Sequence, residues 1–336
     1  MTLLSRVRGV SSRPKMPSLK KTFPTNKVSR VYPNEFSWLP KRGKRTERLQ
    51  FPEYTVTVPH GQSLKASVKL LFLSDIHMDD INKSWLVEAL PHIKRLIQEQ
   101  KIDALIFGGD YICQGDQHIL ALQEWVSSLN IDLKIGIMGN HDYLDGEKGE
   151  KIKQALTDAG VHMLVNGSGL LDLGEKGELV VHGVDDHLLG NPKLGDILDA
   201  VKKMADKTHL GIIHNPKEVE KRPDLLDQFS LILSGHTHGG QVVGMFHWLA
   251  QLIMKQRYIG GLYVHPNKKG KLLVGKGMGT GTILLDEHHH PRLYAFLKWL
   301  GFKNENGLSF ALPRWWEGFS EVPIITLVPE GHSWNA

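Results

Sequence analysis

The sequence has a single cysteine, Cys113, in 336 residues. One cysteine excludes an intramolecular disulfide framework and fits a reducing compartment, where we expect the thiol to be buried. No apolar run reaches the roughly 18 residues that a membrane-spanning helix needs. Residues 1–50 also lack both the apolar stretch of a secretory signal peptide and an adjacent pair of arginines. These absences predict a cytoplasmic protein without a spanning helix.

Basic residues are concentrated at one end of the chain. The net charge is +5, but residues 1–48 hold thirteen Lys or Arg against two Glu, so this segment carries +11 and the rest −6. Residues 1–50 show no helical or strand periodicity and are predicted to form a flexible basic arm. We expect such an arm to contact anionic lipid headgroups. The alternatives are a transit peptide and a disordered leading segment without a function. Nucleic acid is not an expected partner, because the folded part shows no basic face interleaved with aromatic residues.

From residue 51 onward, short apolar runs alternate with helical patterns. Val68–Ser74 is continuously apolar, as in a strand buried on both faces, and Ser84–Gln100 has helical spacing. This alternation predicts one α/β domain over residues 51–336. The other expected strands are 104–107, 134–138, 209–213, 231–233, 272–274 and 323–327, and the other expected helices are 119–129, 151–159, 195–203 and 216–221.

Five polar blocks follow apolar runs, at points where strands are expected to end. They are DIH at 75–77, GD at 109–110, GNHD at 139–142, His214 and GHTH at 235–238. Their oxygen and nitrogen donors, without a thiol, suit two divalent metals that share a carboxylate. Any one of these histidines alone would be interpreted as a core or surface residue. The joint pattern favours a dinuclear site.

The spacing of the blocks indicates how the donors would be used. Asp75 and His77 are two residues apart at the end of a strand, where a turn lets both reach one ion. Asp110 follows two glycines and is the natural bridging ligand. Two metals about 3.5–4 Å apart would bind a phosphate, activate water and stabilise an in-line displacement. The remaining expected donors are Asn140, His214, His236 and His238.

Other histidine-rich segments carry weaker predictions. His182 and His187 flank Asp185–Asp186, an acidic strand exit whose direct role stays open. The run His288–His290 is expected to lie in an exposed loop.

The motifs DIH (75–77), GGD (108–110), GNHD (139–142), IIHNP (212–216) and GHTHGGQ (235–241) resemble the calcineurin-like metallophosphoesterase family, most of all its bacterial phosphodiesterase branch. The resemblance covers about residues 68–283. It implies a four-layer α/β/β/α sandwich with the metal site at the edge of the sheets. The implied ligands of the first metal are Asp75, His77, Asp110 and His238, and those of the second are Asp110, Asn140, His214 and His236.

The resemblance also implies a catalytic residue. His141 would contact the phosphate and protonate the leaving oxygen, oriented by Asp142. One departure concerns this residue, because Cys113 stands where many relatives carry an Asp after the GD pair. Carboxylate support for His141 must then come from elsewhere.

A second departure lies near the C-terminus. About 40 residues separate GMGTG at 277–281 from EVPIITL at 321–327. In relatives the domain often ends soon after a glycine-rich strand of this kind. Residues 242–257 and 284–316 form two apolar, tryptophan-bearing insertions that are predicted to be amphipathic helices. They either pack on each other as a cap or enter a membrane and bind acyl chains, and both remain open.

These features favour hydrolysis of a phosphoester or pyrophosphate bond. The favoured substrate is UDP-2,3-diacylglucosamine, cleaved to UMP and lipid X as some members of the superfamily do in lipid A synthesis. The protein would then lie peripherally on the inner face of the membrane. One alternative is a general phosphodiesterase for soluble substrates such as cyclic nucleotides, and another is a non-catalytic metal-binding membrane scaffold. Mn²⁺ is the favoured metal, Fe, Zn²⁺ and Mg²⁺ are compatible, and the oligomeric state is open.

Overall fold

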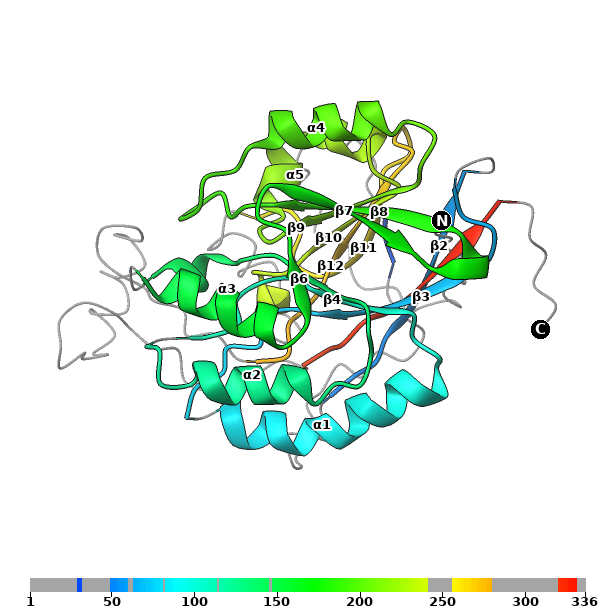
Figure 1. Ribbon diagram of the computed structural model, residues 1–336. Helices are drawn as coiled ribbons and strands as arrows, with labels where there is room; N and C mark the ends of the chain where they lie inside the picture. Colours follow the sequence, from blue (N-terminus) through cyan, green and yellow to red (C-terminus); the bar gives the residue numbers. More distant parts are fainter. Residues whose placement is uncertain are drawn as a thin grey trace, which may run out of the picture.

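The computed structural model describes residues 29–31, 49–59, 63–80, 82–113, 115–144, 147–240, 256–279 and 320–330. In this part of the chain, two β-sheets lie face to face between two layers of helices (Figure 1). The predicted four-layer α/β/β/α sandwich is confirmed.

The first sheet has six strands in the order β2-β13-β3-β4-β5-β6. Strands β3, β4, β5 and β6 are parallel to one another, while β13 pairs antiparallel with β3 and parallel with β2. The strands are β2 (Glu53–Val58), β3 (Val68–Leu73), β4 (Ala104–Phe107), β5 (Lys134–Gly136), β6 (Val161–Met163) and β13 (Ile324–Pro329).

The second sheet has seven strands in the order β1-β11-β12-β10-β9-β8-β7. Strands β8, β9, β10 and β12 are parallel, and β7 and β11 are antiparallel to them. The strands are β1 (Ser29–Val31), β7 (Gly167–Asp172), β8 (Glu178–Val184), β9 (His209–Ile213), β10 (Leu231–Ser234), β11 (Gly261–Val264) and β12 (Lys271–Val274).

Helices cover the outer face of each sheet (Figure 1). The six-stranded sheet carries α1 (Asn82–Glu99), α2 (Ile119–Ser127) and α3 (Lys148–Asp158). The seven-stranded sheet carries α4 (Leu194–Lys203) and α5 (Lys217–Lys221). The short 3₁₀ helices are η2 (Asn140–Tyr143), η3 (Gly174–Lys176), η4 (Pro223–Asp227) and η5 (His238–Gly240).

The central strands are buried on both faces. In β3, Phe72 packs in the layer between the two sheets, while Leu71 and Leu73 pack toward the outer helices. In β9, Leu210 and Ile212 face the other sheet. A strand covered on both sides must be apolar at successive positions, which explains the continuous apolar runs in the sequence.

Some predictions concern residues that the structure does not describe. Most of the predicted basic arm lies outside the described residues, and so do 242–255 and 284–316 of the two insertions. Residues 29–31 of the arm are described and form β1 at the edge of the second sheet, with Ser29 opposite Val264. Among the described helices, none combines the length and apolarity needed to cross a membrane.

Candidate metal centre

Five strand ends supply the predicted ligands from the two sheets. Because the strands that carry them are parallel within each sheet, their carboxyl ends meet at one edge, where α/β proteins build their sites. The structure brings all seven predicted ligands together at this edge. They are Asp75 and His77 after β3, Asp110 after β4, Asn140 after β5, His214 after β9, and His236 and His238 after β10.

The backbone at these ligands is strained. Seven non-glycine residues among those described have positive φ, and five of them are predicted ligands with φ between 45° and 69°. Side chains other than glycine rarely adopt this region, so the surroundings must impose it. Backbone hydrogen bonds do so, for example from Asp75 N–H to Gly109 O (2.9 Å) and from His77 N–H to Asp110 O (3.0 Å). The five residues are Asp75, His77, Asp110, His236 and His238.

One group of donors comprises Asp75, His77 and His238. One ligand atom from each lies within 4.8 Å of the other two. Nε2 of His77 is 3.0 Å from Nε2 of His238, which is in turn 3.4 Å from Oδ1 of Asp75. Two imidazole nitrogens facing each other with a carboxylate beside them form the donor arrangement of a cation site.

A second group comprises Asp110, His214 and His236, again with ligand atoms within 4.8 Å of one another. Oδ1 of Asn140 joins this group at 3.2 Å from Nε2 of His214 and 2.8 Å from Nδ1 of His236. Nδ1 of His214 lies 2.7 Å from Gly108 O, which fixes the ring and leaves Nε2 for the site.

Asp110 lies between the two groups. Its Oδ2 is 3.2 Å from Nε2 of His214 in one group and 3.6 Å from Nε2 of His77 in the other. This is the position that a bridging carboxylate requires. The glycine at 139 makes room for it, because a Cβ there would lie 2.3 Å from Oδ1 of Asp110.

The protonation states suit divalent cations. Burial lowers the pKa of His77, His236 and His238, so these rings are neutral and able to bind metal. Burial raises the pKa of Asp110, but His214 together with His141 and His77 lowers it by more, so the net pKa lies well below its usual value and the carboxylate is ionised. His214 differs from these rings: burial lowers its pKa but Asp110 raises it, with a net rise, so a metal ion at its Nε2 would have to displace a proton.

Two further atoms show that protein groups alone do not satisfy this cluster. Oδ2 of Asp75 and Nδ1 of His77 are buried and have no hydrogen-bond partner. An unsatisfied buried carboxylate oxygen is costly unless a cation or donor meets it. The residues therefore fit two divalent metal ions.

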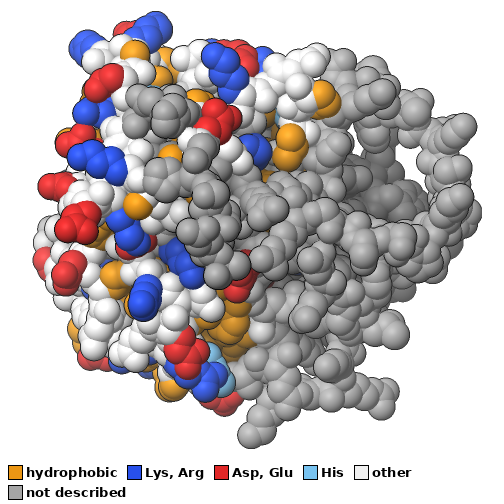
Figure 2. Space-filling view, turned by 90° about the vertical axis from the view of Figure 1, so that its right-hand side faces the viewer, with side chains coloured by type: hydrophobic (Ala, Val, Ile, Leu, Met, Phe, Trp, Pro, Cys, Tyr) orange, Lys and Arg blue, Asp and Glu red, His pale blue; other side chains and the backbone are white. Residues whose placement is uncertain are grey.

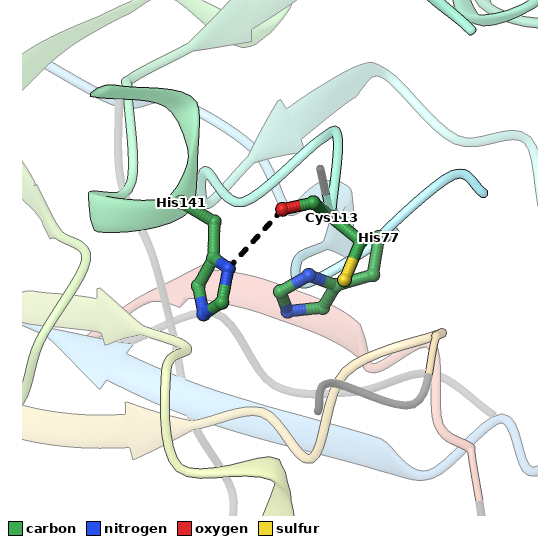
Figure 3. Close-up of side chains that lie close together, drawn as sticks. All are labelled: His77, Cys113 and His141. Carbon is green, nitrogen blue, oxygen red and sulfur yellow. Dashed lines mark hydrogen bonds between the residues drawn. The ribbon is translucent and has the colours of Figure 1, made fainter. Parts of the chain in front are cut away.

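His141 lies beside the first group but belongs to neither. Its ring meets that of His77 edge to face, with centroids 4.7 Å apart. Its Nδ1 is 3.4 Å from the backbone O of Cys113 (Figure 3). The contact that orients the ring is therefore a backbone carbonyl.

Asp142 does not orient His141, contrary to the expectation from the sequence. Its carboxylate instead accepts hydrogen bonds from backbone N–H groups of Gly139 (2.9 Å), Asp110 (3.0 Å) and Tyr111 (2.9 Å). Burial and then the charge of Asp110 raise the pKa of Asp142 to about 7. Its role is to join η2 to the segment after β4.

The structure also reveals neighbours of the site that the motifs did not identify. The hydroxyl of Tyr143 donates to Oδ1 of Asp185 at 2.6 Å and so links η2 to the loop after β8. Asp186 follows in this loop, is buried, and helps to raise the pKa of His214. Only the acidic pair after an apolar run pointed to this loop in the sequence.

The geometry defines a candidate two-metal centre at the edge of an α/β/β/α sandwich. A match to the calcineurin-like phosphoesterase family covers residues 68–240. The chain belongs to this family, and the protein is a metallophosphoesterase, a hydrolase of phosphoesters.

Three known proteins are similar to this chain, two in sequence and one in structure. The chain is 31% identical to the metallophosphoesterase YkuE of Bacillus subtilis, over 74% of this chain and 85% of YkuE. It is 30% identical to phosphodiesterase YaeI of Escherichia coli, over 65% of this chain and 77% of YaeI. The NAD nucleotidase NadN of Haemophilus influenzae is a solved structure with a TM-score of 0.46 and 12% identity, covering 63% of this chain and 46% of that one.

Proposed function

We propose that the protein hydrolyses a lipid-linked pyrophosphate, and that its substrate is UDP-2,3-diacylglucosamine. Water would cleave the P–O–P bond to give UMP and lipid X. Two divalent ions, with Mn²⁺ favoured, would be held by the two ligand groups. The observation that carries the reaction is the position of Asp110 Oδ2, between His77 of one group and His214 of the other.

The chain's own residues account for the remaining steps. Metal ions bound by the two ligand groups would supply a positively charged clamp for phosphate oxygens and would lower the pKa of the attacking water. His141 holds a proton for the leaving oxygen on the ring nitrogen that does not face Cys113, because the carbonyl of Cys113 occupies the side of Nδ1. Its backbone N–H donates to Oδ1 of Asp110 at 2.8 Å, which keeps it beside the centre.

Exposed leucines beside the centre support an acylated substrate. Leu144 follows η2 directly and is 42% exposed, while Leu188 and Leu189 follow Asp186 and are 51% and 49% exposed. The Tyr143–Asp185 hydrogen bond joins the two segments that carry them. Apolar side chains around a charged site suit a ligand with a phosphate head and hydrocarbon tails.

Charge distribution supports a location at a membrane surface. The described part of the face in Figure 2 mixes acidic and basic side chains, without a continuous basic area among the described residues. The excess of positive charge lies instead in residues 1–48. This segment and the apolar insertions would together attract the protein to anionic lipid.

Mixed micelles containing UDP-2,3-diacylglucosamine test the proposal with the full chain and Mn²⁺. We expect UMP and lipid X in equal amounts by mass spectrometry, and slower cleavage of the unacylated UDP-glucosamine. Leu188→Ser/Leu189→Ser should raise KM for the acylated substrate and leave a soluble aryl phosphodiester unaffected. Leu170→Ser is the matched control, since Leu170 is 55% exposed on β7. Absence of UMP together with good cleavage of soluble diesters would refute the lipid substrate.

A phosphodiesterase for soluble substrates such as cyclic nucleotides is the second candidate. The name of the relative YaeI, a phosphodiesterase, favours it. If this protein acts on soluble substrates, its turnover should be independent of detergent and lipid. A non-catalytic metal-binding membrane scaffold is a third possibility, and conversion of any substrate that depends on His141 would rule it out.

A further inference from the structure

The single cysteine lies against the metal centre. The sulfur of Cys113 and one ring nitrogen each of His77 and His141 lie within 4.8 Å of one another (Figure 3). This cluster is distinct from the two ligand groups, although His77 belongs to both the cluster and the first group. Cys113 is 4% exposed and not in a disulfide.

The donors of this cluster differ in chemistry from those of the hydrolytic centre. The two ligand groups offer only carboxylate, amide and imidazole donors. Cysteine sulfur and imidazole nitrogen are both ligands of Zn²⁺, and Zn²⁺ sites with three protein ligands keep an open fourth position. Sulfur shifts preference toward soft metals and away from Mn²⁺ and Mg²⁺.

Local structure holds the three residues in place. Met78 N–H donates to Tyr111 O at 2.8 Å, and Met78 pairs with Ile112 in a short parallel bridge. The segments that carry His77 and Cys113 are therefore fixed side by side. His141 is attached to the second segment through its contact with Cys113 O.

His77, which the cluster shares with the first ligand group, has a buried ring nitrogen without a partner. Its side chain is fully buried, Nε2 faces His238 and Asp110, and Nδ1 has no hydrogen-bond partner. Buried imidazoles normally satisfy both nitrogens, with a hydrogen bond or a metal. A cation bound beside Cys113 is one way to satisfy it.

We propose that His77, Cys113 and His141 form a third cation site, for a thiophilic divalent metal such as Zn²⁺ or Cd²⁺. Binding breaks the S–H bond of Cys113, releases the proton to solvent and forms a metal–sulfur bond, with no change of oxidation state. Both imidazoles bind in their neutral form. Occupancy removes His141 from the leaving oxygen and His77 from the first metal, so the site is inhibitory. The inhibition rests on the proposed function, while the binding does not.

Cadmium titration of the Mn²⁺-loaded full chain tests the binding directly. Cd²⁺ bound to a thiolate absorbs in the near ultraviolet, and Cd²⁺ at oxygen and nitrogen donors does not. We expect the wild type to gain this absorption at one Cd²⁺ per chain with release of one proton. Cys113→Ser should lose it, and His141→Gln should weaken the apparent affinity at least about 10-fold, the scale for loss of support at a metal site. His265→Gln, a buried histidine bonded to Tyr258 at 2.7 Å, is the control for a general effect of losing a histidine.

The outcomes separate this proposal from the proposed function. Absorption at equal affinity in the wild type and His141→Gln would mean that the thiol binds alone, which overturns the cluster. Absence of absorption in a wild-type protein that retains its circular dichroism also overturns it. Inhibition by Zn²⁺ should require at least about 10-fold more metal in Cys113→Ser, and equal sensitivity would overturn the inhibitory role. Failure to cleave any phosphoester would refute the proposed function but leave the absorption result intact.

Discussion

Oδ1 of Asp110 accepts a hydrogen bond from the backbone N–H of His141 at 2.8 Å. Its other oxygen, Oδ2, faces imidazoles of both ligand groups. One carboxylate thus sets the relation between the two metal positions and the start of η2, which carries His141. Changes at Asp110 should therefore act on metal binding and on the position of His141, the proposed proton donor, together.

Asp110→Asn tests the bridging position. The amide keeps an oxygen for the N–H of His141 but removes the negative charge between the metals. Loss of a residue that only supports a metal ligand already costs about 10–100-fold in affinity or activity. Asp110 would contact both metals directly, so we expect Asp110→Asn to lose more turnover than this and to bind fewer than two metals. Elemental analysis after dialysis and turnover against Mn²⁺ concentration measure both. Asp132→Asn, at an exposed carboxylate, is the control, and two tightly bound ions in Asp110→Asn would contradict the assignment.

His141→Gln tests the proton donor. His141 belongs to neither ligand group, so metal content should be unchanged. General acid catalysis contributes about 10²–10⁴-fold, so turnover of an ester with an alkyl leaving group should fall by this factor. An ester of p-nitrophenol should lose far less, because its leaving oxygen needs no proton. Equal losses on the two esters would show that His141 acts in another way.

The sequence could predict which side chains gather at this edge because each is a polar residue that follows a buried apolar strand. The parallel β3, β4 and β5 place the ends of their strands at one edge, so the pattern of strand ends is sufficient to bring Asp75, Asp110 and Asn140 together. The distances that make Asp110 a bridge depend on how the two sheets face each other. The hydrophobic periodicity within a single strand carries no information on how the two sheets face each other.

Contacts between segments distant in the sequence could not be predicted in the same way. Asp142 was expected to orient its neighbour His141, but its carboxylate reaches N–H groups across 31 or 32 positions of the chain, at Asp110 and Tyr111. The three-residue β1 is too short to show strand alternation. The position of the Cys113 thiol beside His77 likewise arises from a contact between distant segments, in which Met78 pairs with Ile112 beyond the ends of β3 and β4.

His182 makes stability sensitive to acid at a place away from the metals. Its side chain is buried, with Nδ1 2.7 Å from Ser168 Oγ and Nε2 2.9 Å from His209 Nδ1. Burial, and then His209, lower the pKa of His182 to about 3. As pH falls from about 6.5 to about 3, the unfolded chain binds a proton here that the folded chain does not, so the free energy of unfolding falls.

Urea unfolding at several pH values measures this effect. In the wild type, the free energy of unfolding should fall more steeply below pH 6.5 than in His182→Gln, by up to about 1.4 kcal/mol per pH unit for one proton. His162→Gln, at an exposed position on β6, should retain the wild-type slope. Parallel slopes in the wild type and His182→Gln would show that His182 titrates normally in the folded state.

Lys276 and Glu321 form a buried ion pair that supports the segment behind Asp75. Nζ of Lys276 is 2.7 Å from Oε2 of Glu321, and the backbone N–H of Lys276 donates to Oε1 at 3.0 Å. The side chains are 13% and 1% exposed. The next residue, Gly277, lies against Asp75, where an added Cβ would be 2.7 Å from the Asp75 Cβ. The pair therefore fixes the backbone against which this ligand packs.

Lys276→Met should leave the carboxylate of Glu321 buried without its cation. Removing one partner of a buried pair costs about 3–5 kcal/mol of unfolding free energy, and the loss should show in urea unfolding of the metal-free protein. Lys276→Met/Glu321→Gln removes the charge and keeps an acceptor for the N–H of residue 276, so much of the stability should return. Lys202→Met, which breaks the exposed pair with Asp199, should change stability little. If the single and double variants were equally unstable, the charge of Glu321 would not be the cause, and the contribution of Lys276 would lie in its packing alone.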